Sequence, residues 1–384
     1  MVPKGWTLLQ VSDICKLQNG NSFKPHEWDT QGLPIIRIQN LNGSDNYNYF
    51  SGVPQDKWLV EPGQLLFSWA GTKGVSFGPF IWNGPKGVLN QHIYKVFANE
   101  NVHGHWLYLA LLHITQKIEA QAHGFKSTLL HVQKKDIDNQ FVLTPPVAEQ
   151  KKIAQILSTW DNAISVTEKL LTNSQLQKKA LMQKLLTGKK RLLDERGVRY
   201  GGEWHRAELG AVLDYMQPTP YLVDSTDYND SYSIPVLTAG KSFILGYTNE
   251  EHGIYHAPLP AIIFDDFTTD SKFVDFEFKA KSSAMKILTA KKGVSAKYIF
   301  EAMQMLKFKI GGHQRHWISI YSNLVIPIPD AKEQQKIASA LSTADGEIST
   351  LEKKLACLKE EKKALMQQLL TGKRRVKMDE AVAA

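Results

Sequence analysis

The chain has 384 residues, which is enough for two or three domains that each bury a core of their own. Hydrophobic residues make up 43% and charged residues 22%, which excludes a wholly disordered or collagen-like chain. The 46 Lys and Arg outnumber the 38 Asp and Glu, so the formal net charge is +8, which is compatible with a polyanionic partner. Two cysteines, Cys15 and Cys357, exclude a disulfide framework and a cysteine zinc site. With no apolar leader and no apolar stretch of about 18 residues, we expect a soluble cytoplasmic protein.

Residues 1–145 are predicted to form a small α+β domain. Strand-like runs rich in β-branched and aromatic residues lie at 33–38, 64–68 and 92–97. A helix-like segment follows at 105–120. Loops rich in Gly, Asn, Asp and Ser connect the strands.

A long helix is predicted within residues 146–191. Residues with 4-3 spacing form its seam: Ile153, Leu157, Trp160, Ile164, Thr167, Leu171, Ser174, Lys178, Leu181 and Leu185. Spacing of this kind over more than four heptads is typical of a coiled coil rather than of a helix on a globular core. Pro146 suits the start of the helix and Gly188 suits its C-terminal cap.

Residues 192–328 are predicted to form a second α+β domain. Strand-like runs lie at 233–237, 261–264 and 284–288, and a helix-like segment at 296–308. The second domain matches the first only faintly, and Trp204 stands at its start as Trp6 does in the first domain.

A second long helix is predicted within residues 329–375, because this segment repeats the first. The repeat has an offset of 184, and 24 of the 40 aligned positions of 149–188 and 333–372 are identical. The second seam contains Ile337, Leu341, Ala344, Ile348, Leu351, Leu355, Leu358, Lys362, Leu365 and Leu369. Asp330 with Glu333 is a candidate capping box. Residues 376–384 are predicted to be a disordered tail.

The apolar seams of the two predicted helices can pack against each other within one chain. An antiparallel pair would be about 60 Å long and would place the two domains at its opposite ends on an approximate two-fold axis. The alternative is that each helix packs only on its own domain. We expect the antiparallel arrangement.

The basic excess lies in the two predicted helices, where residues 146–191 carry +6 and residues 330–375 carry +3. The second domain is polarised, since residues 203–278 carry −10 and residues 279–316 carry +8. If this domain touches nucleic acid, the basic segment is expected to face the phosphates. The alternative is that these lysines form a solvated face.

A glycine-led loop at 312–317 favours the nucleic-acid interpretation. It presents Gln314 beside Arg315, and these side chains have the hydrogen-bonding geometry for adenine and guanine edges in the major groove. At the equivalent place in the first domain, residues 124–128 again have a glycine followed by polar and cationic side chains.

No convincing catalytic pattern is present. Gly71-Thr72-Lys73-Gly74 lacks the spacing of a phosphate-binding loop. Asp266, Glu277 and Lys279 imitate a magnesium-dependent nuclease, but loose carboxylate patterns of this kind are common by chance. The histidines lack the spacing of a helical zinc pair, so we predict no catalytic residue and no metal site.

The doubled helix motif resembles the specificity subunit of type I restriction-modification systems. The resemblance rests on Pro-Pro-Val-Ala-Glu-Gln-Lys-Lys-Ile at 145–153 and Leu-Leu-Thr-Gly-Lys at 185–189, with the motif repeated at 333–337 and 369–373. The opening Trp6 and the runs at 61–66 and 89–93 resemble the target recognition domains of that family. The second domain departs from the first, with Ala261 where the first has Gly63, so contacts cannot be copied between them.

The resemblance implies a non-catalytic DNA reader of host defence: two mixed α/β target recognition domains separated by an antiparallel coiled coil with a pseudo-two-fold axis. Two methyltransferase subunits and two restriction subunits would dock on it. The double-stranded DNA target would be bipartite and asymmetric, with an adenine methylated in each half. The chain itself would need no cofactor, because S-adenosylmethionine, ATP and Mg²⁺ would belong to the partners.

The candidate DNA contacts lie in the glycine-led loops and beside them. They are Lys73, Lys126, Ser127 and Thr128 in the first domain, and Lys281, Gln314, Arg315 and His316 in the second. Two other functions remain open: a stand-alone endonuclease built on Asp266, and a coiled-coil scaffold with no nucleic-acid role. The endonuclease would nick DNA with Mg²⁺ alone, and the scaffold would show no sequence-dependent binding.

Overall fold

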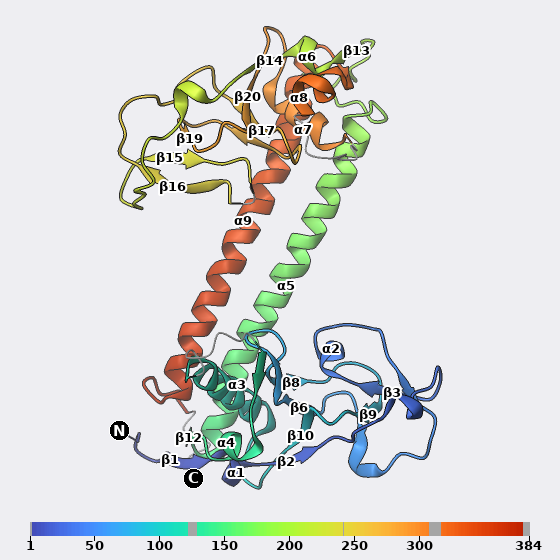
Figure 1. The fold of residues 1–384 in the computed structure, drawn as a ribbon, viewed down its shortest axis with the longest axis vertical. Coiled ribbons are helices and arrows are strands. Elements are labelled where there is room, and N and C mark those ends of the chain that lie inside the picture. The colour runs from blue at the N-terminus through green and yellow to red at the C-terminus, as the bar shows by residue number, and fades with distance from the viewer. Residues whose placement is uncertain (1, 122–128, 241, 307–315, 379–384) are drawn as a thin grey trace. The chain divides into compact units, whose positions relative to one another are not determined.

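The computed structural model describes residues 2–121, 129–240, 242–306 and 316–378 (Figure 1). The chain forms two compact units. The first, unit 1, combines residues 1–167 with 354–384, and the second, unit 2, contains residues 168–353. In the described residues, no helix is long and apolar enough to cross a membrane.

Unit 1 is built around a four-stranded antiparallel sheet in the order β2-β10-β6-β8. Its strands are β2 (Cys15–Asn19), β10 (Ile93–Ala98), β6 (Leu65–Ser68) and β8 (Gly78–Ile81). A second sheet has the order β4-β3-β9-β5 and contains β4 (Tyr49–Phe50), β3 (Leu33–Ile36), β9 (Gly87–Leu89) and β5 (Leu59–Val60). Two ladders complete the unit: β1 (Thr7–Gln10) with β12 (Phe141–Thr144), and β7 (Ala70–Thr72) with β11 (Leu129–His131).

Helix α3 (Gly104–Gln121) covers the first sheet of unit 1 at β8. Its buried Trp106 and Leu107 join Phe67 of β6 in the largest core of the unit. The shorter helices are α1 (Val11–Ile14), α2 (Ile38–Leu41), α4 (Lys134–Asp138) and the 3-10 turns η1 (Pro25–Glu27) and η2 (Asp56–Trp58).

Unit 2 repeats this plan. Its four-stranded sheet has the order β14-β20-β17-β18 and contains β14 (Leu213–Met216), β20 (Met285–Ala290), β17 (Ala261–Asp265) and β18 (Ser271–Val274). A three-stranded sheet contains β16 (Ile244–Thr248), β15 (Ile234–Leu237) and β19 (Lys279–Ala280), and β13 (His205–Glu208) pairs with β21 (Val325–Ile328). The helices are α6 (Leu209–Val212), α7 (Ala296–Gln304), α8 (His316–Ser319), η4 (Thr219–Tyr221) and η5 (Tyr321–Asn323).

The predicted α+β class and the predicted strands and late helices are therefore confirmed. Helix α3 matches the segment predicted at 105–120. Helix α7 ends at Gln304, earlier than predicted, and residues 307 and 308 lie outside the described part of the chain. The four-stranded sheets of the two units have the same strand order, since β2-β10-β6-β8 corresponds to β14-β20-β17-β18. The faint sequence match between the two domains therefore reflects a common fold.

The two long helices are α5 (Val147–Leu185) and α9 (Ala331–Leu370). Their C-terminal glycines, Gly188 and Gly372, have φ of +72° and +66°, a conformation that glycine adopts without steric cost. The backbone N–H of Glu333 donates to Asp330 Oδ1 at 2.9 Å, so Asp330 caps α9 as predicted. The carboxylate of Glu333 is instead bound by Arg191.

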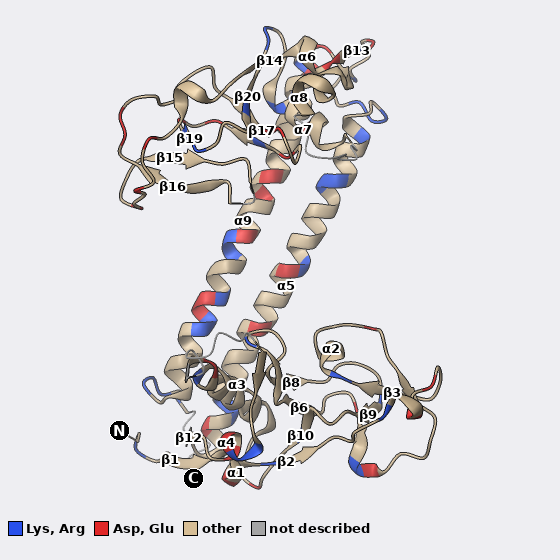
Figure 2. Cartoon of the chain, in the orientation of Figure 1, with Lys and Arg blue, Asp and Glu red and all other residues tan. Residues whose placement is uncertain are grey.

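Segments of α5 and α9 pair in an antiparallel manner inside each unit. In unit 1, Asp161 of α5 pairs with Lys362 of α9, while the earlier Glu149 pairs with the later Arg375. In unit 2, Ser174 and Lys178 of α5 bond to Glu347 and Asp345 of α9, which again run in opposite directions along the chain. The antiparallel prediction is confirmed for each unit, and Figure 2 shows acidic and basic residues interspersed along both helices.

The two lysines of the predicted seams are neutralised by partner carboxylates. Lys178 Nζ lies 2.5 Å from Asp345 Oδ1 and 3.2 Å from the fully buried Glu301 of α7. Burial by itself would raise the pKa of Asp345, but hydrogen bonds from Lys178 and Lys297 hold it below its usual range. A polar pair of this kind inside an apolar seam favours one register of the two helices over others.

The domain ranges predicted from the sequence, 1–145, 146–191, 192–328 and 329–375, stay predictions as boundaries. The compact units differ from them, because each unit takes in a segment of both helices. Of the predicted tail, residues 376–378 have no regular secondary structure and residues 379–384 lie outside the described residues.

Candidate DNA interface

In unit 1, Lys73 lies in the loop that follows β7. Its ammonium donates to the backbone carbonyl of Glu119 at 2.6 Å, in the last turn of α3. A cation at this position suits the negative end of the helix dipole. The Glu119 carboxylate accepts the Gly74 N–H at 2.7 Å, so the loop is fixed to the end of α3 from both sides.

The other predicted contacts of unit 1, Lys126, Ser127 and Thr128, lie outside the described residues. Their chain neighbours are nevertheless placed. Leu129 in β11 pairs with Thr72 in β7, and the segment before residue 122 is the end of α3, which Lys73 contacts. The structure therefore places the described chain on both sides of residues 122–128, at Glu119 and at Leu129, next to the loop that contains Lys73.

In unit 2, Asp266 organises the equivalent region. This buried residue follows β17, and its carboxylate accepts the Trp317 N–H at 2.8 Å and lies 3.3 Å from Lys286 Nζ. Its backbone N–H donates to the carbonyl of Ala284 at 3.2 Å. The end of β17, the loop after β19 and the start of α8 are thus held together by one side chain and its backbone.

The prediction that His316 contacts DNA disagrees with the structure. His316 is 1% exposed, and its Nδ1 lies 2.9 Å from the carbonyl oxygen of Asp266. The ring serves the interior of the unit and cannot reach a DNA base in this conformation. Gln314 and Arg315 lie outside the described residues, directly before this fixed point.

Lys281, the remaining predicted contact, follows β19. Its backbone N–H donates to Leu237 O at 2.9 Å, and its half-buried side chain forms no ion pair with any residue that the structure describes. Lys281 and Ala284 belong to one loop, and Ala284 bonds to Asp266. The structure therefore connects this loop through Asp266 to His316, whose N–H donates to Asp266 O at 3.0 Å.

In the basic segment of unit 2, residues 279–316, fewer lysines are free to bind phosphates than the net charge suggested. Lys279 is fully buried and pairs with Glu250 at 2.6 Å, and Lys286 is 1% exposed and pairs with Asp266. Lys297 pairs with Glu301 and Asp345. The expectation that the whole segment faces phosphates is wrong for these three lysines, because buried or half-buried acidic residues of the unit neutralise them.

The structure does not support a nuclease centre formed by Asp266, Glu277 and Lys279. Asp266 is bound to Lys286, Lys279 to Glu250, and the exposed Glu277 to His256 at 2.8 Å. Each member of the predicted set is engaged by a different partner, so the set is not assembled around a common ion.

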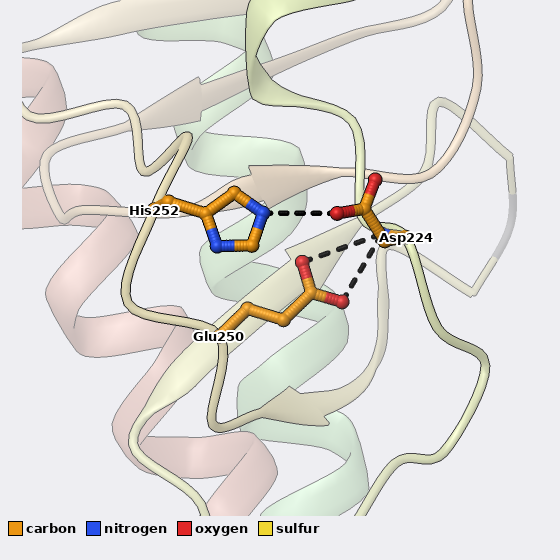
Figure 3. Close-up of side chains that lie close together, drawn as sticks. All are labelled: Asp224, Glu250 and His252. Carbon is orange, nitrogen blue, oxygen red and sulfur yellow. Dashed lines mark hydrogen bonds and ion pairs between the residues drawn. The ribbon is translucent and has the colours of Figure 1, made fainter.

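One group with metal-ligand types does come together among the described residues: Asp224, Glu250 and His252 (Figure 3). The Glu250 carboxylate accepts the backbone N–H groups of Asp224 and Ser225 and a hydrogen bond from Lys279. Burial opposes its ionisation, but these donors hold the pKa of Glu250 below its usual range. An ammonium group already occupies this carboxylate, so we assign the group as an ion-pair network.

The sequence analysis did not predict a hydrogen-bonded group of one arginine, one glutamate and one tryptophan that occurs once in each unit. We call each group a lock. In unit 1, Arg375 donates to both carboxylate oxygens of Glu149 at 2.7 and 2.8 Å, and Trp6 Nε1 donates to the same carboxylate at 2.9 Å. In unit 2, Arg191 donates twice to Glu333 at 2.6 Å, and Trp204 Nε1 donates at 2.9 Å.

The signal for these locks was present in the sequence. Both tryptophans open a domain, both glutamates lie in the first turn of a long helix, and Arg191 and Arg375 are separated by the repeat offset of 184. Each guanidinium also lies over its tryptophan ring, at 5.3 and 5.6 Å from the centroid. Because the same geometry occurs in both units, we infer that the locks are part of the common fold.

Comparison with known proteins identifies the family. A family model described as "Type I restriction modification DNA specificity domain" matches residues 3–174 and again residues 202–360. The specificity subunit of the type I restriction enzyme EcoR124I/EcoR124II of Escherichia coli is 55% identical over 139 residues, which cover 35% of this chain and 34% of that protein. A putative type I restriction enzyme MjaX specificity subunit of Methanocaldococcus jannaschii is 26% identical and covers 98% of this chain and 95% of its own.

Fold comparison agrees. A solved structure of the S subunit of a type I restriction-modification system from M. genitalium matches 98% of this chain and 97% of its own with a TM-score of 0.65, at 15% sequence identity. The fold is therefore shared although the sequences have diverged. Because the family model covers most of the chain and matches each half separately, this protein belongs to the family of type I restriction-modification DNA specificity subunits.

Proposed function

We propose that the chain is the sequence-specific DNA-recognition subunit of a type I restriction-modification complex and reads a bipartite, asymmetric target. The observation that carries this proposal is the duplication: two units share one sheet order but have different residues at the loops beside β7 and β17. Two readers with different loops are expected to recognise two different short blocks, with unread bases between them.

Specificity in this proposal comes from the loops beside α3 and α8. Lys73 and residues 126–128 would contact the first block, and Lys281, Gln314 and Arg315 the second. Lysines that bind phosphates position the protein, whereas Gln314 and Arg315 distinguish bases by hydrogen bonds in the major groove. We leave His316 out of this set because it is buried.

The chain in this proposal has no catalytic role of its own. Two methyltransferase subunits would dock on it and methylate an adenine in each block, and two restriction subunits would join them for cleavage. S-adenosylmethionine, ATP and Mg²⁺ would be bound by those partners, and the complex would act in the cytoplasm, where it meets DNA.

Co-expression with the methyltransferase subunit of its own system tests the proposal. Sequencing that detects methylated adenine is expected to show one bipartite motif with two unlike blocks, in the presence of this chain only. Methylation of a continuous motif, or the same methylation without this chain, would contradict a bipartite reader. The competing endonuclease function predicts that the purified chain nicks DNA with Mg²⁺ alone.

A further inference from the structure

Three aromatic side chains of unit 1 meet next to the loop that contains Lys73. Trp69 follows β6, His92 precedes β10, and His131 is the last residue of β11. The Trp69 ring centroid lies 5.1 Å from that of His92 and 4.9 Å from that of His131, and the two imidazoles are 5.9 Å apart. We call these residues the Trp69 cluster.

The indole of Trp69 is held firmly. Its Nε1 donates to Gln91 O at 3.1 Å and to Asn19 Oδ1 at 3.4 Å, and Tyr94 stacks on it with a centroid distance of 6.1 Å. The backbone carbonyl of Trp69 also accepts the N–H of Val132 at 3.0 Å, which fixes the residue after His131. The Trp69 indole and the backbone of Val132 thus lie on either side of His131, whose ring contacts the indole edge-on.

The two imidazoles have unequal environments. His92 Nε2 lies 3.2 Å from Gln91 Nε2, and its Nδ1 is buried without a hydrogen-bond partner. Burial, with a smaller contribution from His131, lowers the pKa of His92, so this ring is neutral near pH 7. His131 is exposed, and the structure shows no hydrogen bond to its ring nitrogens from any described residue.

This chemistry suits a base edge better than a phosphate. The cluster has no lysine or arginine, and aromatic rings with single donors and acceptors are not an electrostatic site for a polyanion. An exposed imidazole presents ring nitrogens that can form hydrogen bonds, which is the kind of group that reads the edges of bases.

The internal repeat gives independent support. In the numbering of the helix repeat, whose offset is 184, His131 corresponds to Arg315, the residue predicted to read a base in the second block. In the numbering of the opening tryptophans, whose offset is 198, Trp69 corresponds to Phe267, which follows β17 and is 42% exposed. In unit 2, Phe267 follows Asp266, whose carbonyl accepts the N–H of His316 at 3.0 Å, and in unit 1, Trp69 contacts His131.

We propose that His131 is a specificity-determining residue that contacts a base of the first block, and that Trp69 is the residue that positions it. This inference rests on the proposed function and adds to it the residue that reads one base. His131 would be the counterpart in unit 1 of Arg315 in unit 2.

The test uses the full chain co-expressed with its methyltransferase subunit, with methylated-adenine sequencing as the readout. His131→Ala is expected to relax the preference at one position of the first block by about five- to tenfold, the lower range for one base contact, and to leave the second block unchanged. Trp69→Ala is expected to give the same relaxation, whereas Trp69→Phe, which keeps an aromatic ring, retains most of the preference. His26→Ala, at an exposed histidine of the same unit, is the matched control and is expected to match the wild type.

The experiment distinguishes a failure of the proposed function from a failure of the inference about His131. If wild-type chain produced no bipartite motif, the proposed function itself would fail. If the wild-type motif were present and His131→Ala left every position of the first block unchanged, the inference about His131 would be wrong. A uniform loss of methylation at both blocks in His131→Ala, with hydrogen exchange of unit 1 unaltered, would likewise overturn it, since a base reader acts on its own block.

Discussion

The guanidinium of Arg375, beyond the last turn of α9, makes a two-point hydrogen bond with the buried carboxylate of Glu149 in the first turn of α5. The pair joins residues that are 226 positions apart and is reproduced in unit 2 by Arg191 and Glu333. Arg375 also donates to Lys4 O at 2.9 Å, so the lock secures the N-terminal segment of unit 1 as well. In each unit the end of one long helix is tied to the start of the other.

Loss of either arginine is expected to loosen only its own unit. Arg375→Ala leaves the buried Glu149 carboxylate with Trp6 as its remaining side-chain donor, which is expected to cost about 2 kcal/mol after allowance for the exposure of the guanidinium. Arg191→Ala is expected to cost more, about 3 kcal/mol, because that side chain is less exposed, at 20% against 44%. Hydrogen–deuterium exchange resolves the two units, and the neighbouring exposed Arg374→Ala is the matched control. Equal loosening of both units by Arg375→Ala would refute the local role of the lock.

The effects of replacing Lys178 and Asp345 on the free energy of unfolding are expected to be non-additive, because the two side chains form an ion pair. Lys178→Met leaves the fully buried Glu301 with Lys297 as its remaining cation, so we expect a loss of about 2 kcal/mol in unit 2. In a double-mutant cycle with Asp345→Asn, the coupling energy is expected to be about 1 kcal/mol or more. The measurement is chemical denaturation of the four proteins, and strictly additive effects would show that the pair does not interact.

Arg315 is expected to control the second block. Arg315→Ala is expected to cost about 1 to 3 kcal/mol of discrimination at one base pair and to keep the first block intact. Lys281→Ala, in contrast, is expected to weaken binding to all sequences alike, with a salt dependence that is smaller by about one charge. Methylated-adenine sequencing distinguishes the two, and an unchanged second block in Arg315→Ala would show that this residue is not a base reader.

The length of α5 is expected to set the unread spacer, because this helix is the covalent link between the two recognition domains. Inserting four residues, roughly one helical turn, into the middle of α5 is expected to change the spacer and to preserve both blocks. Replacing four exposed residues at the same place, without insertion, serves as the control. Motif mapping that showed altered blocks with an unchanged spacer would contradict this role.

A histidine of α3 is expected to make unit 1 sensitive to acid. Burial, with a smaller contribution from Lys117, lowers the pKa of His113 from 6.5 to about 4. Between these values the unfolded chain binds a proton that the folded chain does not, so the free energy of unfolding falls as the pH drops from about 6.5 towards 4. Urea denaturation across this range is expected to show a shallower slope for His113→Leu than for the wild type. The exposed His26→Leu is the control, and equal slopes for wild type and His113→Leu would rule out His113 as the source.

Features that depend on near neighbours in the chain were predictable. The 4-3 spacing of α5 and α9, the cap at Asp330 and the glycines at Gly188 and Gly372 are local patterns, and each was found where expected. The duplication was likewise readable, since a repeat of 184 residues is a property of the sequence alone.

Features that depend on distant partners were not predictable. Lys279 and Lys286 belong to a basic run, but the charge of a run does not reveal which of its members meet a carboxylate in the interior. His316 looked like a surface residue of a glycine-led loop until Asp266, 50 residues away, was found to bind it.

The amino-acid sequence by itself determined the number of recognition units, the long helices between them and the family to which the chain belongs, because periodicity and repetition are written along the chain. The tertiary structure alone decided which charges are neutralised, which histidine is buried, and that Trp69, His92 and His131 form one cluster. The physical reason is that burial and hydrogen bonding are set by segments that are far apart in the chain and adjacent only after folding.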